Sequence, residues 1–186
     1  VTKYAVVVGI SDYPGGNNDL SYCDDDATDW YNYLVRHGYE PANIRVYGDP
    51  NQNDFPKYTG LANKATVQAG LNAMVAEADE NDIITYATSG HGYGDGRGES
   101  MLNMMDDDLY DHEIATIFNG AATSRVFIFF DHCYSGGIGP ELMALPNNDN
   151  IFATSTCTER GLGYDDPDSQ NGMWTNEFVH DTLETH

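Results

Sequence analysis

The 186-residue chain is long enough for one domain of ordinary size, and 40% of its residues are hydrophobic, which suffices for a single packed core. Its 30 acidic and 8 basic residues give a formal charge of −22, which disfavours nucleic acid and anionic membranes as partners. No apolar stretch approaches the roughly 20 residues that span a bilayer, and no signal-peptide pattern precedes the first expected strand. The acidic surplus is compatible with solubility in high salt, with calcium binding or with basic substrates.

Apolar, β-branched runs alternate along the chain with segments that have helical patterning or helix end signals. In chain order they predict strand Lys3–Ile10, helix Asp24–His37, strand Asn43–Tyr47, helix Lys64–Ala78, strand Asp82–Thr88, helix Leu109–Phe118, strand Ser124–Phe130, strand Asn150–Thr156 and helix Trp174–Leu183. Such alternation favours an α/β sandwich of three layers, with a mostly parallel central sheet and helices on both faces.

The chain starts at Val1 and reaches strand-like sequence within three residues. We therefore expect residues 1–186 to be a single domain excised from a longer parent chain. Only one helix follows the last expected strand, so we also expect the C-terminal part of the fold to be truncated. Three cysteines fit no disulfide framework, and neither a CxxC pair nor a His/Cys cluster with zinc spacing is present.

The polar and glycine-rich segments follow the expected strands. In open α/β sheets ligands bind beyond the carboxyl ends of the strands. Those ends carry "GISDY", "SGHG", "DHCYSGG" and "TSTCTER". The sequence therefore places the site at that edge of the sheet.

His91 ends the third expected strand and Cys133 the fourth, so adjacent parallel strands would place them side by side. A thiol attacks well only as a thiolate, which a nearby imidazole generates or stabilises. The amides of Gly92 and Cys133 would face a developing oxyanion, and the flanking glycines, including Gly136 and Gly137, would leave the approach open. The alternative is a structural cysteine at a strand end and a solvated loop histidine.

"TYATSGHG" together with "FIFFDHCYSGG" resembles the caspase-like cysteine peptidases, and the metacaspases and their prokaryotic relatives most closely. The resemblance extends over nearly the whole chain, through "YAVVVGISDY", "LSYCDDDATDW" and "FATSTCTER". It implies a caspase-like three-layer sandwich and a peptidase that works through an acyl-enzyme. It makes His91 the general acid/base and Cys133 the nucleophile. His132 stands where these relatives usually have a small residue, and we expect it to have a structural or supporting role.

The resemblance also implies a specificity pocket. Asp26 and Asp131 fall at the positions where metacaspase-like relatives place two carboxylates, and Ser155 at a strand edge lining the same pocket. Two carboxylates match a guanidinium or ammonium group, which predicts cleavage after Arg or Lys. The neighbouring Asp24 and Asp25 are interpreted as complements of a helix dipole. Arg160, in the loop after the fifth strand, is a candidate self-processing point.

"MMDDDLYDHE" (104–113) is a second acidic cluster. Many metacaspases bind calcium between the catalytic histidine and cysteine, and the resemblance makes Asp106 and Asp111 candidate ligands of an activating Ca²⁺. His112 replaces the usual acidic neighbour of Asp111. Alternatively, Asp107 and Asp108 only cap the helix expected near Leu109. The chemistry itself requires no cofactor.

Two other functions stay open. One is a legumain-like peptidase specific for Asn, and the other is a catalytically silent, acidic or calcium-dependent interaction module. For the peptidase we expect protein or peptide substrates with Arg or Lys at the cleavage site, and a monomer. The compartment stays open between cytoplasmic and extracellular, as part of a longer prokaryotic chain.

Overall fold

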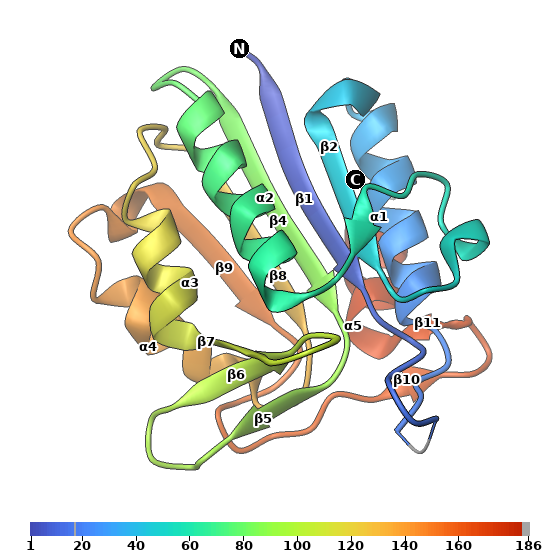
Figure 1. The fold of residues 1–186 in the computed structure, drawn as a ribbon. Coiled ribbons are helices and arrows are strands. Elements are labelled where there is room, and N and C mark those ends of the chain that lie inside the picture. The colour runs from blue at the N-terminus through green and yellow to red at the C-terminus, as the bar shows by residue number, and fades with distance from the viewer. Residues whose placement is uncertain (17, 184–186) are drawn as a thin grey trace.

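A computed structural model of the chain describes residues 1–16 and 18–183 (Figure 1). At its centre lies a six-stranded sheet in the order β3-β2-β1-β4-β8-β9, in which every pair is parallel. The strands are β1 Lys3–Gly9, β2 Ile44–Gly48, β3 Gly60–Leu61, β4 Ile83–Ser89, β8 Val126–Asp131 and β9 Ile151–Ser155. The predicted α/β architecture with a parallel sheet is confirmed.

Helices cover both faces of this sheet (Figure 1). The first face packs against α2 (Lys64–Glu77), α3 (Asp111–Phe118) and α4 (Ile138–Met143). The second packs against α1 (Cys23–Arg36) and the C-terminal segment, in which α5 (Met173–Thr175) continues as a π-helix over Asn176–Leu183. Single 3-10 turns occur at Pro41–Asn43, Gln52–Asp54, Ser135–Gly137 and Asn148–Asn150.

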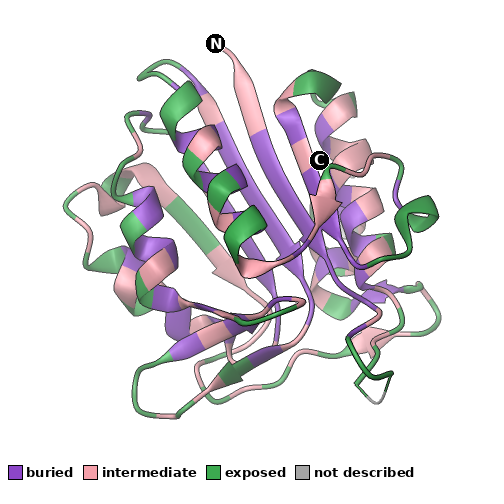
Figure 2. Cartoon of the chain, viewed as in Figure 1, coloured by how far each residue is buried: buried purple, intermediate pink, exposed green. Residues whose placement is uncertain are grey.

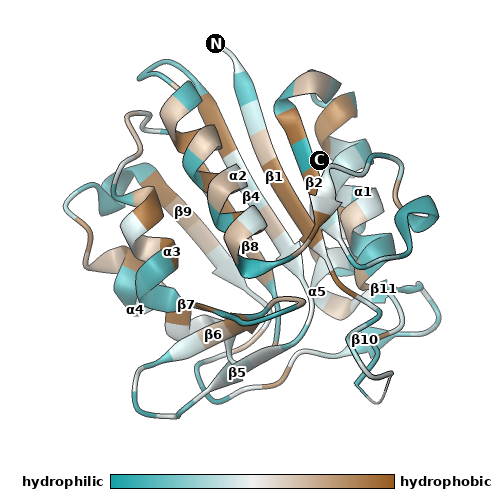
Figure 3. Ribbon diagram, in the orientation of Figure 1, coloured by the Kyte–Doolittle hydropathy of each residue, from teal (hydrophilic) through white to brown (hydrophobic). Residues whose placement is uncertain are grey.

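Strand β1 shows why the first apolar run has no alternating polar positions. Val6 and Val8 point into the core under α2 and α3, whereas Ala5 and Val7 point into the core under α1. A central parallel strand is buried on both faces, so every position favours an apolar, mostly β-branched residue. Figures 2 and 3 show the same central strands as both buried and hydrophobic. No helix in the described part of the chain is long and apolar enough to cross a membrane.

The chain reverses its winding direction between β1 and β4. From β1 it crosses to β2 and β3 on one side, and the later strands β4, β8 and β9 are added on the other. Such a switch point opens a crevice at the carboxyl ends of the two strands. Gly9 ends β1 there, and a Cβ at this position would collide with the Cys23 carbonyl oxygen. Glycine therefore lets the start of α1 pack directly on the end of β1.

Two small sheets lie at the same end of the molecule, where the parallel strands finish (Figure 1). One is antiparallel and consists of β5 (Gly92–Gly94), β6 (Ser100–Asn103) and β7 (Asp108–Tyr110). The other pairs β10 (Asp165–Asp166) with β11 (Asn171–Gly172). The sequence predicted only loops here, because glycine and aspartate dominate these segments.

Two predicted helices have different boundaries or geometry. The third was expected to begin at Leu109, but Leu109 pairs with Leu102 in β6–β7 and α3 begins at Asp111. Helix α4 was not predicted, since it is only six residues long. The last helix lies where expected, although most of it has π-helical hydrogen bonding.

Candidate active site

The ends of β4 and β8 and the start of α1 surround a pocket of about 250 Å³. Both members of the expected dyad, His91 and Cys133, line it, together with Asp131. The complete lining is Leu20, Cys23, Ser89, Gly90, His91, Asp131, His132, Cys133, Gly163, Tyr164 and Asp165. Adjacent strands produce this grouping, because Ser89 at the end of β4 pairs in register with Asp131 at the end of β8. His91 and Cys133 each follow two residues later.

Cys133 is a free, half-buried thiol. Its Sγ lies 3.8 Å from the carbonyl oxygen of Gly163, which is the acceptor that the thiol faces. Burial raises the pKa of the Cys133 thiol above its usual value, and the contact with Gly163 opposes that shift. In the resting state the sulfur is therefore protonated, and its activation requires a base.

The His91 ring, which lines the same pocket, has a nitrogen available as a base. Its Nε2 lies 2.7 Å from the carbonyl oxygen of Asn18. A carbonyl oxygen only accepts, so Nε2 carries the proton and Nδ1 is the ring nitrogen that can take one up. The ring also packs against Tyr13, with 4.8 Å between ring centroids.

Glycines near the thiol allow close packing. A Cβ at Gly92 would collide with the Cys133 carbonyl oxygen, so β5 approaches the cysteine loop directly. A Cβ at Gly136 would collide with the Cys157 carbonyl oxygen, and one at Gly137 with the Ser100 hydroxyl. The two glycines after the cysteine thus bring its loop against β6 and the loop after β9. This differs from the open approach that the sequence suggested for them.

Asp26 and Asp131 converge on one point behind the thiol. The N–H of Gly172 donates to Asp26 Oδ1 at 2.9 Å, and the Ser89 hydroxyl donates to Oδ2 at 2.6 Å. The N–H and the hydroxyl of Thr175 both donate to Asp131 Oδ2 at 3.0 Å. A Cβ at Gly172 would touch Oδ2 of both carboxyl groups. Only glycine fits where the two carboxyls meet.

The two carboxyl groups differ in access. Asp26 is 0% exposed and lies behind the pocket wall, whereas Asp131 is 7% exposed and lines the pocket. Burial, and next the charge of Asp131, raises the pKa of Asp26 well above its usual range. Burial raises the pKa of Asp131 to about 6 against the opposing bonds from Thr175, and the charge of Asp165 adds to the increase. Both carboxyl groups are therefore harder to ionise than a solvent-exposed aspartate.

Two pocket residues were not found from the sequence. Ser89 holds Asp26 and lines the pocket, and Asp165 adds a second carboxyl group to the lining beside Asp131. Residue 165 reaches this position because it pairs with Gly172 across β10–β11. By contrast, Ser155 donates its hydroxyl to the Cys157 carbonyl at 3.1 Å and is not among the lining residues. Arg160 is exposed and donates to the Gly96 carbonyl at 2.9 Å.

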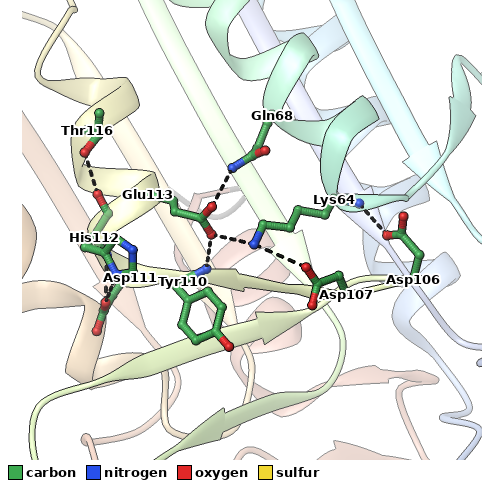
Figure 4. A network of polar contacts seen from close by, with 9 residues as sticks. All are labelled: Lys64, Gln68, Asp106, Asp107, Tyr110, Asp111, His112, Glu113 and Thr116. Atoms are coloured by element: carbon green, nitrogen blue, oxygen red, sulfur yellow. Dashed lines mark hydrogen bonds and ion pairs between the residues drawn. The ribbon is translucent and has the colours of Figure 1, made fainter.

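The acidic cluster at 104–113 is committed to hydrogen bonds with the protein itself (Figure 4). Asp106 accepts the Lys64 N–H at 2.8 Å, and Asp107 pairs with the Lys64 ammonium at 3.5 Å. Asp111 is buried and accepts the N–H groups of Ser100 and His112 on its two oxygens, at 2.7 and 2.6 Å. Within residues 1–16 and 18–183, no three His, Cys, Asp or Glu side chains group as metal ligands. These oxygens are thus hydrogen-bonded within the protein rather than grouped as Ca²⁺ ligands.

The fold is α/β, and its pocket holds a thiol and an imidazole just beyond the carboxyl ends of two adjacent parallel strands. The chain belongs to the caspase domain family of cysteine peptidases, whose model matches residues 2–184. This confirms the resemblance that the sequence motifs carry.

Curated relatives are metacaspases from fungi. Metacaspase-1 of Candida glabrata is 29% identical over 154 residues, which cover 73% of this chain and 37% of the relative. Metacaspase-1 of Saccharomyces cerevisiae S288c is 27% identical over 154 residues, covering 73% and 34%. The chain thus spans about a third of the length of the curated relatives it matches. Among solved structures, protein GSU0716 from Geobacter sulfurreducens shares the fold with a TM-score of 0.74 and 17% identity, covering 100% of this chain and 83% of that one.

Proposed function

We propose that this domain is a cysteine endopeptidase that cleaves peptide bonds after Arg or Lys, with His91 and Cys133 as its catalytic dyad. One observation carries the proposal: the thiol, the imidazole and the Asp131 carboxyl line a single pocket. A pocket of this kind can hold a basic side chain against the carboxyls while the following carbonyl group meets the sulfur.

The reaction follows from the positions of the donors and acceptors. His91 Nδ1 takes the proton of Cys133 as Sγ attacks the substrate carbonyl carbon, and the tetrahedral oxyanion forms beside the Gly92 and Cys133 amides. On collapse, His91 returns that proton to the leaving amine and the acyl group stays on sulfur. Water, deprotonated by His91, then attacks the thioester; collapse releases the acid, and His91 returns the proton to the departing Cys133 sulfur. The Asn18 carbonyl stabilises the imidazolium in both half-reactions, through the Nε2 proton that it accepts.

The carboxyl groups support the specificity for a cation. Asp131 and Asp165 line the pocket and can contact a guanidinium directly, and the Asp26 carboxyl lies behind the wall. A bound cation favours ionisation of carboxyls whose pKa is raised in its absence. The neutral side chain of Asn offers no such gain, and the carboxylate of Asp would be repelled. These contacts favour Arg or Lys over the legumain-like alternative.

Fluorogenic peptides that differ only in having Arg, Lys, Asn or Asp before the scissile bond test the proposal. We expect turnover after Arg and Lys, and its loss in Cys133→Ala, with Cys157→Ala as the matched control for removing a thiol. A chloromethyl ketone bearing Arg should label Cys133. Exclusive turnover after Asn or Asp would overturn the pocket assignment. Absence of both turnover and labelling, with and without calcium, would favour the silent interaction module.

Calcium activation and the monomeric state remain predictions of the sequence resemblance. A calcium titration of the same Arg substrate addresses the first. Sedimentation of the active protein addresses the second.

A further inference from the structure

His132 precedes the proposed nucleophile, and its imidazole links three segments of the site. Its Nδ1 lies 2.9 Å from the carbonyl oxygen of His91, and its Nε2 lies 2.9 Å from the hydroxyl of Thr88. Because the carbonyl only accepts, Nδ1 carries the proton and Nε2 accepts the Thr88 hydroxyl proton. This tautomer satisfies both ring nitrogens inside the protein.

The ring is not placed to exchange protons with a substrate. His132 is 1% exposed, and burial lowers its pKa to about 4. It therefore stays neutral, with both nitrogens engaged, over the pH range in which a thiol peptidase works. Its two ring nitrogens contact the His91 carbonyl oxygen and the Thr88 hydroxyl instead.

Hydrogen bonds, rather than side-chain packing of its neighbours, hold the His91 backbone. Glycine precedes and follows it, so neighbouring side chains cannot hold this loop by packing. Its N–H donates to Tyr13 Oη at 2.8 Å, and its carbonyl oxygen also accepts the Asn103 N–H at 2.9 Å. A Cβ at Gly90 would collide with Tyr13 Oη and lie 3.2 Å from Cε1 of His132, so this loop packs closely on both side chains.

We infer that His132 is a positioning residue, whose Nδ1–H fixes the His91 carbonyl and thereby aims the His91 ring at Cys133. The inference rests on the proposed function of the dyad. Small displacements of a catalytic group lower the rate of the chemical step, on the order of 10–100-fold. The substrate cation is held by Asp131 and Asp165, so KM should change little.

Three substitutions separate this role from a space-filling one. His132→Asn keeps an N–H donor near the position of Nδ1. His132→Gln keeps a polar group near Nε2 and loses the donor to His91, and His132→Leu loses both contacts at similar volume. With an Arg substrate we expect His132→Asn to retain most of kcat. The Gln and Leu variants should lose roughly 10–100-fold in kcat, with KM within about threefold of the parent value.

The Cε1–H proton resonance of His91, assigned by its loss in His91→Ala, provides a readout independent of turnover. We expect it to shift in His132→Gln and to stay near its parental position in His132→Asn. If the Leu variant fails to fold, the Asn and Gln pair decides. The inference is overturned if Gln and Asn have equal kcat and equal resonances. If the parent protein cleaves nothing, the proposed function fails, and the resonances still decide whether His132 positions His91.

Discussion

Asp131 is a residue at which the proposed binding of a cation and the stability of the fold oppose each other. Its carboxyl has a pKa of about 6 in the fold, against 3.8 ordinarily, mainly because it is buried. A carboxyl whose pKa is raised by folding contributes stability below the unfolded pKa. That contribution is lost as the pH rises through the folded pKa, here between about 4 and 6. At neutral pH the ionised group therefore lowers the free energy of unfolding while the pocket is empty, and a bound cation would offset this loss.

This opposition predicts paired pH effects. For an Arg substrate, KM should rise as the pH falls through about 6, because the protonated carboxyl no longer attracts the cation. Asp131→Asn should lose binding of Arg yet gain thermal stability, by up to roughly 3 kcal/mol at pH 8 and little at pH 4. KM–pH profiles and thermal melts at both pH values measure these effects. A pH-independent stability difference between the two proteins would contradict the assignment.

Asp165 makes a second prediction at the residue scale. It lines the pocket, so Asp165→Asn should raise KM for an Arg substrate by about tenfold while kcat stays nearly constant, since one charge contact of 1–2 kcal/mol is removed. Asp168 is exposed in the same loop, and Asp168→Asn gives the matched change in net charge. Equal effects of the two substitutions would mean that only the overall charge matters.

At the scale of elements, the C-terminal segment serves both the core and the pocket. Phe178 packs against Trp30 and Phe129, with ring centroids 6.2 and 5.3 Å apart. The same segment carries Thr175, whose two hydrogen bonds hold Asp131. It directly follows Gly172, whose N–H donates to Asp26. Packing of aromatic rings on the second face of the sheet thus supports the segment that holds Asp26 and Asp131.

Phe178→Ala should therefore act on both stability and substrate binding. We expect it to lower the free energy of unfolding by about 2–4 kcal/mol, because the partly buried ring packs among other aromatics. It should also raise KM for an Arg substrate as Thr175 loosens. Denaturant melts and kinetics measure the two effects, with the exposed Glu177→Ala as control on the same helix. Loss of stability with unchanged KM would mean that packing of the C-terminal segment does not affect substrate binding.

The elements also show how far sequence reasoning extends here. The parallel strands were predictable because burial on both faces leaves continuous apolar runs. The grouping of His91 and Cys133 was predictable because they closely follow the ends of two such strands. Asp165 was not, since a two-residue strand pairing that brings it beside Gly172 leaves no periodic signal. Ser89 ends an apolar strand, and its bond to Asp26 joins positions 63 residues apart. The roles of these residues exist only after the chain has folded.

At the scale of the whole molecule, a formal charge of −22 surrounds a site proposed to bind cations. A field of one sign raises the local concentration of oppositely charged substrates and speeds their encounter. The same charges repel one another and oppose compactness. Both effects weaken with salt, because the screening length is only about 10 Å at 0.1 M ionic strength.

Salt should therefore shift activity and stability in opposite directions. For a peptide with several basic residues, kcat/KM should fall as sodium chloride is added, while the melting temperature of the enzyme rises. A peptide with the same Arg at the cleavage site but flanking acidic residues is the control, and its kcat/KM should fall less or increase. Measuring both peptides over one salt series separates screening of the molecular field from screening inside the pocket, which affects them equally. If both peptides respond alike, the surface charge has no part in substrate capture, and recognition belongs to the pocket carboxylates alone.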